Sequence, residues 1–221
     1  RHVDALAAIT KYLGLGDYGA WDEQQRQQFL LQELASPRPL LPLSALSTDV
    51  VSGFSDEVRE VLATFQLLAT QPAEALGAYV ISMAHQPSDV LAVMVLQRKA
   101  DSRHPLRVVP LFETYDDLAR APSCLRSLLA LPIYRECIGN HQEIMIGYSD
   151  SAKDAGFLAA AWAQYQAQEA LASLAAEAGI NLVFFHGRGG SVSRGGAPTD
   201  QALRSQPPGS VKGALRVTEQ G

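Results

Sequence analysis

The sequence predicts a helix-rich α/β fold in which parallel strands are joined by crossover helices. Residues 1–75 carry apolar side chains at helical spacing, whereas short apolar runs alternate with helical segments from residue 76 onward. The apolar runs are continuous, as is typical of strands that are buried on both faces. About five such runs are visible, fewer than the eight strands of a closed barrel. A (β/α) barrel and an open doubly wound sheet therefore both fit the pattern.

The first part of the chain, residues 1–75, is predicted to be a helical segment. A first helix over residues 5–12 ends at glycines, and a second begins at Asp22 and ends before the prolines of residues 36–39. We expect a loop over residues 40–53 and a third helix from Asp56 onward.

The second part, residues 76–221, is predicted to form a sheet with crossover helices. Strands are expected over residues 77–83, 106–112, 143–149 and 181–185 and near residue 215. The expected helices cover residues 90–96, 115–119, 123–130 and 151–177, with a further one near residue 200.

Composition excludes several classes of protein. The chain has 221 residues, of which 47% are hydrophobic and 19% charged, and its net charge of −5 gives no support for binding nucleic acid or an anionic membrane. Two cysteines make neither a metal cluster nor a disulfide framework, which favours a reducing, cytoplasmic location. No apolar run reaches the ~18 residues of a membrane span. We expect a piece of a larger protein, because the chain starts at Arg1 and stops at Gly221 directly after an apolar stretch.

Charged side chains follow three consecutive strands of the predicted sheet. Glu113 follows the second strand, Asp150 and then Lys153 follow the third, and His186 ends the fourth. In a parallel α/β barrel the active site forms at this end of the strands, where carboxylates can hold Mg²⁺ or Mn²⁺. Each residue also has an ordinary interpretation: Asp150 as a helix cap, Lys153 as a solvated lysine, and His186 as a packed histidine under a loop. Their coincidence at one edge favours a site.

The glycine-rich loop over residues 186–196 is the most specific feature. Its glycines allow backbone N–H groups to approach an anion, and Arg188 and Arg194 add positive charge. A flexible linker and an arginine–glycine segment that binds nucleic acid are the alternatives. Both are weakened because the loop follows a buried strand and precedes further ordered-looking sequence.

These segments resemble signature sequences of the phosphoenolpyruvate carboxylase family. Residues 185–190 and 194–196 look like its glycine-rich catalytic loop, and residues 145–156 look like its second signature. Shorter matches lie at residues 80–83, 87–93, 110–113, 205–208 and 215–221. The similarity covers essentially the whole chain, and Ser151-Ala152-Lys153 resembles the bacterial form most.

The resemblance implies a fold and an activity. The fold would be a partial TIM (β/α)₈ barrel with additional helices, in which residues 1–75 are a helical segment of the catalytic domain and residues 76–221 carry the metal site and catalytic loop. The enzyme would be a Mg²⁺- or Mn²⁺-dependent cytoplasmic homotetramer with allosteric control. It would convert phosphoenolpyruvate and bicarbonate to oxaloacetate and phosphate through carboxyphosphate and pyruvate enolate.

The resemblance also assigns roles to single residues. Glu113 and Asp150 match metal ligands, and Lys153 matches a lysine near bicarbonate. Arg188 and Arg194 match essential loop arginines, His186 matches a histidine that aids substrate binding, and Arg1 matches an arginine near the phosphate. Arg194 also matches a residue that contacts the feedback inhibitor aspartate.

Some positions depart from the family's pattern. Ser193 stands where glycine is usual, and Asp200 and Arg204 stand where histidine and an aliphatic residue are common. Further catalytic residues of the family are absent, so we expect the isolated chain to have little or no carboxylase activity. A second hypothesis is an inactive truncated relative that acts as an anion-binding or oligomerising module.

Overall fold

A computed structural model describes residues 1–36, 48–100, 102, 104–187 and 199–218 of the chain. The described residues form two compact units, one made of Arg1–Tyr79 with Gln86–Val108 and the other of Val80–His85 with Val109–Gly221. The predicted boundary between residues 75 and 76 stays a prediction.

The first unit is helical. Its elements are α1 (His2–Tyr12), α2 (Glu23–Ala35), α3 (Thr48–Ser52), α4 (Asp56–Thr70) and α5 (Pro87–Lys99), with short 3₁₀ turns at Tyr18–Ala20 and Ala73–Ala75. Side-chain caps explain where two helices begin: Asp22 accepts a hydrogen bond from the Gln25 N–H, and Ser55 accepts one from the Val58 N–H. Helix α3 falls in the stretch predicted to be loop.

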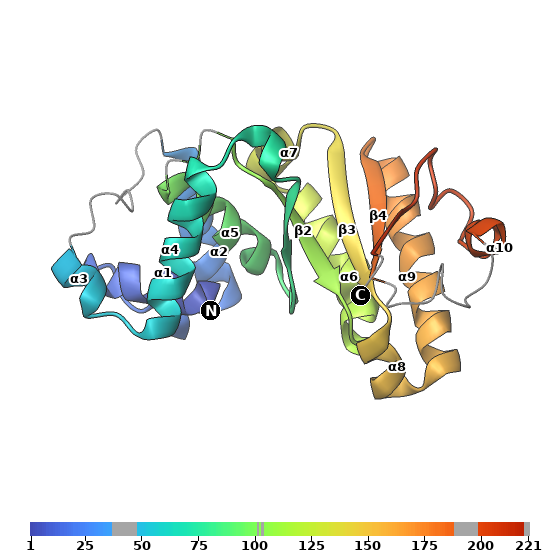
Figure 1. Cartoon of the computed structure of the whole chain (residues 1–221), viewed down its shortest axis with the longest axis horizontal. Helices are drawn as coiled ribbons and strands as arrows, with labels where there is room; N and C mark the ends of the chain where they lie inside the picture. Colours follow the sequence, from blue (N-terminus) through green and yellow to red (C-terminus); the bar gives the residue numbers. More distant parts are fainter. Residues whose placement is uncertain (37–47, 101, 103, 188–198, 219–221) are drawn as a thin grey trace. The chain divides into compact units, whose positions relative to one another are not determined.

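The second unit contains most of a five-stranded sheet with the order β1-β2-β3-β4-β5 (Figure 1). The strands are β1 (Ala78–Ile81), β2 (Arg107–Phe112), β3 (His141–Gly147), β4 (Asn181–Gly187) and β5 (Arg216–Val217). Pairings from β2 through β5 are parallel, as predicted. The order of the strands in the sheet is their order in the chain, because each connection leads to the strand that lies directly beside the previous one.

The helices of the second unit are α6 (Tyr115–Leu129), α7 (Pro132–Ile138), α8 (Ser149–Ala155), α9 (Phe157–Glu177) and α10 (Thr199–Arg204). Helices α6 and α9 pack against one another and lie behind β2 to β4 in Figure 1. Helix α8 starts where β3 ends, so it places its first turn at the carboxyl edge of the sheet.

Two helix predictions in this unit are wrong. The expected long helix over residues 151–177 is two helices, because Gly156 adopts φ +81° and interrupts it. The expected break before Ser123 is absent, and α6 runs through Pro122. The buried face of Leu118, Ala121 and Leu125 keeps α6 continuous despite the hydrogen bond that proline cannot donate.

The faces of the sheet are not equally buried. Along β4, Leu182, Phe184 and His186 are buried, whereas Val183 and Phe185 between them are half-buried. Alternating side chains of a strand point to opposite faces. Among the described residues, one face of β4 is only half-buried, so the prediction that every strand is buried on both faces is wrong for this strand.

Candidate carboxylate site at the edge of the sheet

Two carboxylates meet at the carboxyl edge of the sheet. Glu113 directly follows β2, and Asp150 lies in the first turn of α8, after β3. Burial raises the pKa of Glu113, and the neighbouring Asp150 raises it further through its negative charge and a side-chain hydrogen bond with Glu113. A shared proton or a bound cation would relieve the repulsion between two such groups.

Strand register and one glycine bring this pair together. Leu111 pairs with Met145 and Phe112 with Ile146, so the next position of β2 lies beside Gly147. A Cβ atom at Gly147 would lie 2.6 Å from the Glu113 Cβ and 2.9 Å from its Cα. Only glycine fits here, because the clash would be with the start of the side chain and the backbone.

Lys153 also lies at the carboxylate pair. Its Nζ lies 2.9 Å from Asp150 Oδ1, and its side chain is 76% exposed. Lys153 lies in the last turn of α8, where the helix dipole favours a positive charge, and its ammonium also pairs with Asp150. The exposed ammonium can reach an anion at the same edge.

A histidine–aspartate pair near this edge was missed by sequence reasoning. His85 Nδ1 lies 2.8 Å from Asp117 Oδ1, and the Asp117 side chain is buried. Burial raises the pKa of Asp117, but hydrogen bonds from Thr114 and the contact with His85 lower it by more, so the net shift is downward. The spacing Thr114-x-x-Asp117 is a capping-box signal that could have identified the aspartate. Nothing in the sequence around His85 indicated its partner.

His186 lies in the buried row of the sheet. It pairs in register with Ile146, which pairs with Phe112, and all three side chains are buried. Its Nδ1 lies 2.8 Å from the hydroxyl oxygen of Tyr148, a partner that sequence reasoning also missed. The structure therefore gives His186 a place among packed side chains, with Tyr148 fixing the orientation of its ring.

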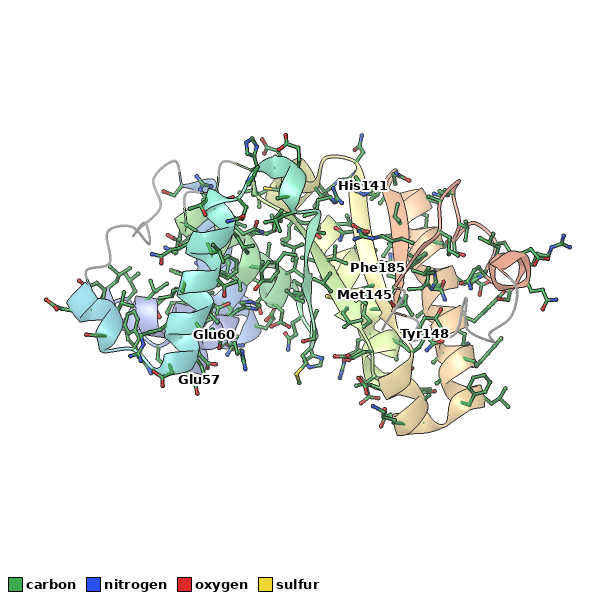
Figure 2. All side chains as sticks on the ribbon, in the orientation of Figure 1. Glu57, Glu60, His141, Met145, Tyr148 and Phe185 are labelled. Atoms are coloured by element: carbon green, nitrogen blue, oxygen red, sulfur yellow. The ribbon has the colours of Figure 1, made fainter. Side chains whose placement is uncertain are left out.

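The opposite row of the sheet is half-buried. Met145 and Phe185 pair in register and are labelled close together in Figure 2. The Arg216 guanidinium lies 4.2 Å above the Phe185 ring and pairs with buried Glu143. The contacts with the aromatic ring and the carboxylate fix the position of the Arg216 side chain.

The carboxylate pair suits a hard divalent cation. Carboxylate oxygens are the donors that Mg²⁺ and Mn²⁺ prefer, and Mg²⁺ usually binds through one or two carboxylates and keeps several waters or substrate oxygens. Among the described residues, no group of three or more histidine, cysteine, aspartate or glutamate side chains could hold a metal ion. A cation held by these two carboxylates would keep its other coordination positions for water or substrate oxygens.

Comparison with known proteins identifies the family. The family model described as phosphoenolpyruvate carboxylase matches residues 1–221. The chain belongs to the phosphoenolpyruvate carboxylase family. It is 62% identical over its whole length to the phosphoenolpyruvate carboxylase of Alcanivorax borkumensis, 58% to that of Acinetobacter baumannii and 57% to that of Shewanella sediminis. It spans 24%, 25% and 24%, respectively, of the length of these three relatives.

Other residues matched to phosphoenolpyruvate carboxylase belong to the first unit, to α10 or to segments outside the described residues. Arg1 belongs to the helical unit, where its guanidinium lies 3.4 Å from Glu60. Arg188, Arg194 and the departure at Ser193 lie outside the described residues. The departures at Asp200 and Arg204 are exposed on α10. No helix among the described residues is long and apolar enough to cross a membrane.

Proposed function

We propose that the chain supplies the metal-binding edge of a phosphoenolpyruvate carboxylase, which converts phosphoenolpyruvate and bicarbonate to oxaloacetate and phosphate. The observation that carries this proposal is the meeting of Glu113 and Asp150 after neighbouring parallel strands. Family membership supports it, since the matched relatives bear this name.

We also propose that the sheet is part of a (β/α)₈ barrel. The strand order β1-β2-β3-β4-β5 never reverses, as in a barrel, whereas a doubly wound sheet reverses its order at a switch point. The half-buried row of Leu111, Met145 and Phe185 would then face the barrel interior. Active sites of such barrels form where the carboxylate pair lies, at the carboxyl ends of the strands.

Glu113 and Asp150 would hold Mg²⁺ or Mn²⁺. The bound cation would neutralise charge on substrate oxygens and on the enolate. The two carboxylates have the right chemistry, and the repulsion between them falls when a cation binds.

The remaining roles belong to cationic side chains. Attack of bicarbonate on phosphorus gives carboxyphosphate and pyruvate enolate, a transfer that depends on positioning and charge neutralisation. Lys153 would hold bicarbonate, since its exposed ammonium lies at the same edge. We assign Arg188 and Arg194 to the phosphate and to carboxyphosphate or CO₂, and Arg1 to the phosphate.

His186 would act as a positioning residue for substrate binding. It is buried and bonded to Tyr148, and Gly187 follows it at the end of β4. Its packed ring would therefore fix where the loop after β4 starts.

The first experiment measures Mn²⁺ binding to the chain by the loss of the free-ion electron paramagnetic resonance signal. We expect one site, and we expect Asp150→Asn and Glu113→Gln each to weaken it at least tenfold. Asp116→Asn, an exposed aspartate on α6, is the matched control and should bind as the unaltered chain does. Equal binding by all four proteins would contradict the proposed site.

The second experiment measures oxaloacetate formation with a coupled malate dehydrogenase assay. The chain spans about a quarter of its relatives' length, so we expect little or no turnover by the chain alone. Normal turnover would overturn that expectation. In the whole enzyme we propose a cytoplasmic homotetramer under allosteric control.

A second candidate function is that of an inactive relative that serves as an anion-binding or oligomerising module. Calorimetry with Mn²⁺ and a phosphoenolpyruvate analogue separates the two. Metal-dependent binding of the analogue supports the carboxylase site, whereas metal-independent anion binding supports the module.

A further inference from the structure

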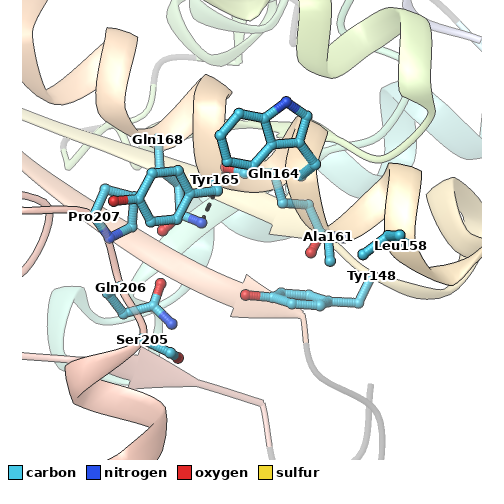
Figure 3. Close-up of a pocket in the computed structure, with 10 residues that line it drawn as sticks. Tyr148, Leu158, Ala161, Gln164, Tyr165, Gln168, Ser205, Gln206 and Pro207 are labelled. Carbon is cyan, nitrogen blue, oxygen red and sulfur yellow. Dashed lines mark hydrogen bonds between the residues drawn. The ribbon is translucent and has the colours of Figure 1, made fainter.

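A pocket of about 320 Å³ lies in the second unit, between α9 and the segment that follows α10 (Figure 3). Its volume is at the lower end of the range of small-molecule sites. The described residues of its lining combine aromatic rings with amide and hydroxyl groups, and none of them is charged: Tyr148, Leu158, Ala161, Trp162, Gln164, Tyr165, Gln168, Ser205, Gln206 and Pro207.

The polar floor of the pocket is fixed by hydrogen bonds. The Gln164 side-chain nitrogen donates to the Gly147 carbonyl oxygen and to Ser151 Oγ, both at 3.0 Å. The Gln168 nitrogen donates to the Gln164 carbonyl oxygen at 3.2 Å, the bond that is drawn in Figure 3. Because a carbonyl oxygen needs a donor, this bond settles which end of the Gln168 amide is nitrogen.

The wall of the pocket includes a buried amide oxygen, that of Gln168. The side chain is 3% exposed, and its Oε1 has no hydrogen-bond partner among the described residues. A buried acceptor without a donor is destabilising, because it has lost its hydrogen bonds to water. An occupant of the pocket that offers an N–H or O–H group would remove this cost.

The walls favour a flat occupant. The Trp162 and Tyr165 rings are parallel to within 4° at a centroid distance of 5.8 Å, and Trp162 is 60% exposed. Figure 3 shows the Tyr148 and Tyr165 rings on two sides of the space that Gln206 and Pro207 close. Aromatic side chains stack on planar groups. A phosphate or carboxylate would find no cation among the described residues of this lining to compensate for its lost hydration.

We propose that this pocket is a binding site for an uncharged planar heterocycle that carries an N–H donor, of the kind found in a nucleobase. The heterocycle stacks on the aromatic wall and donates its N–H to Gln168 Oε1. Neither Glu113 nor Asp150 is among the described residues that line this pocket.

The test uses the chain labelled with ¹⁵N and follows its two tryptophan indole signals by nuclear magnetic resonance while adenosine is added. Trp162 lines the pocket and Trp21 lies in the other unit, so a Trp21→Phe variant assigns the two signals. We expect a saturable shift of the Trp162 signal while the Trp21 signal stays in place. Adenosine 5′-monophosphate should bind no more tightly, because the part of the lining that the structure describes has no cation for its phosphate.

Matched controls isolate the hydrogen bond. N6,N6-dimethyladenosine lacks the N–H donor, and Gln168→Met removes the acceptor while keeping the side-chain length. Each change should weaken binding about tenfold, the effect of losing one hydrogen bond. Gln166→Met, an exposed position on the same helix, should bind adenosine as the unaltered chain does. Absence of a saturable shift, or equal binding of the two nucleosides, would overturn the proposal.

Discussion

Gly147→Ala tests whether close contact of two backbones builds the carboxylate pair. The new Cβ would lie 2.6 Å from Glu113 Cβ and 2.9 Å from Glu113 Cα, well inside ordinary van der Waals contact. Neither atom is the end of a flexible side chain, so β2 and β3 must separate. Overpacking of this kind costs about 1–3 kcal/mol. The same movement should take Glu113 away from Asp150 and weaken Mn²⁺ binding.

Hydrogen exchange measured by mass spectrometry reports this change strand by strand. Protection of the β3 peptide should fall in the Gly147→Ala variant by about tenfold for each 1.4 kcal/mol lost. Gly187→Ala is a graded comparison, since its nearest neighbour at 2.9 Å is the flexible Met145 Cε, and we expect a smaller loss. Gly77→Ala, where a Cβ meets nothing within 4 Å, should leave protection unchanged. A Gly147→Ala chain with unaltered β3 protection and Mn²⁺ affinity would refute the reasoning.

Three further predictions concern buried polar groups. Lys99 is 1% exposed and pairs with Glu33 at 2.8 Å. Glu33→Leu removes this counter-ion, so urea unfolding should show a free energy of unfolding lower by about 3–5 kcal/mol. A second change, Lys99→Met, should largely restore it. Burial and, to a smaller extent, the N-terminal charge lower the pKa of His2 from 6.5 to about 4. Between these two pH values the unfolded state binds more protons than the folded state, so the free energy of unfolding should rise from pH 4 to pH 6.5. This contribution to the slope should be absent in a His2→Gln chain. Tyr148→Phe removes the 2.8 Å hydrogen bond to His186 and should lower thermal stability by about 1–2 kcal/mol, whereas an unchanged melting temperature would show that this bond contributes nothing.

The sequence predicted the strands well because their apolar runs are uninterrupted. Expected strands at residues 106–112 and 143–149 correspond to β2 at Arg107–Phe112 and β3 at His141–Gly147. Since parallel strands end at a common edge, the positions of Glu113 and Asp150 after these runs were enough to predict that they lie together. Their roles as metal ligands stay predictions.

Other features depend on information that single-sequence patterns do not carry. Gly156 stood inside a helical pattern, and only its backbone conformation of φ +81° shows that the helix stops there. Helix α7 at Pro132–Ile138 was missed because it is short and has only one buried residue, Tyr134. The hydrogen bond between Tyr148 and His186 joins residues 38 positions apart, a pairing that depends on the register of β3 and β4.

The sheet is bordered by its two shortest strands, β1 with four residues and β5 with two. An edge strand presents backbone N–H and C=O groups that a foreign strand can pair with, and a short edge limits how many such bonds form. In a closed (β/α)₈ barrel, as proposed above, further strands would pair with β1 and β5 and would leave the sheet without an edge. The longer strands, β3 and β4, would offer more unpaired backbone groups for aggregation if they were exposed. Each of them is paired with a strand on both sides.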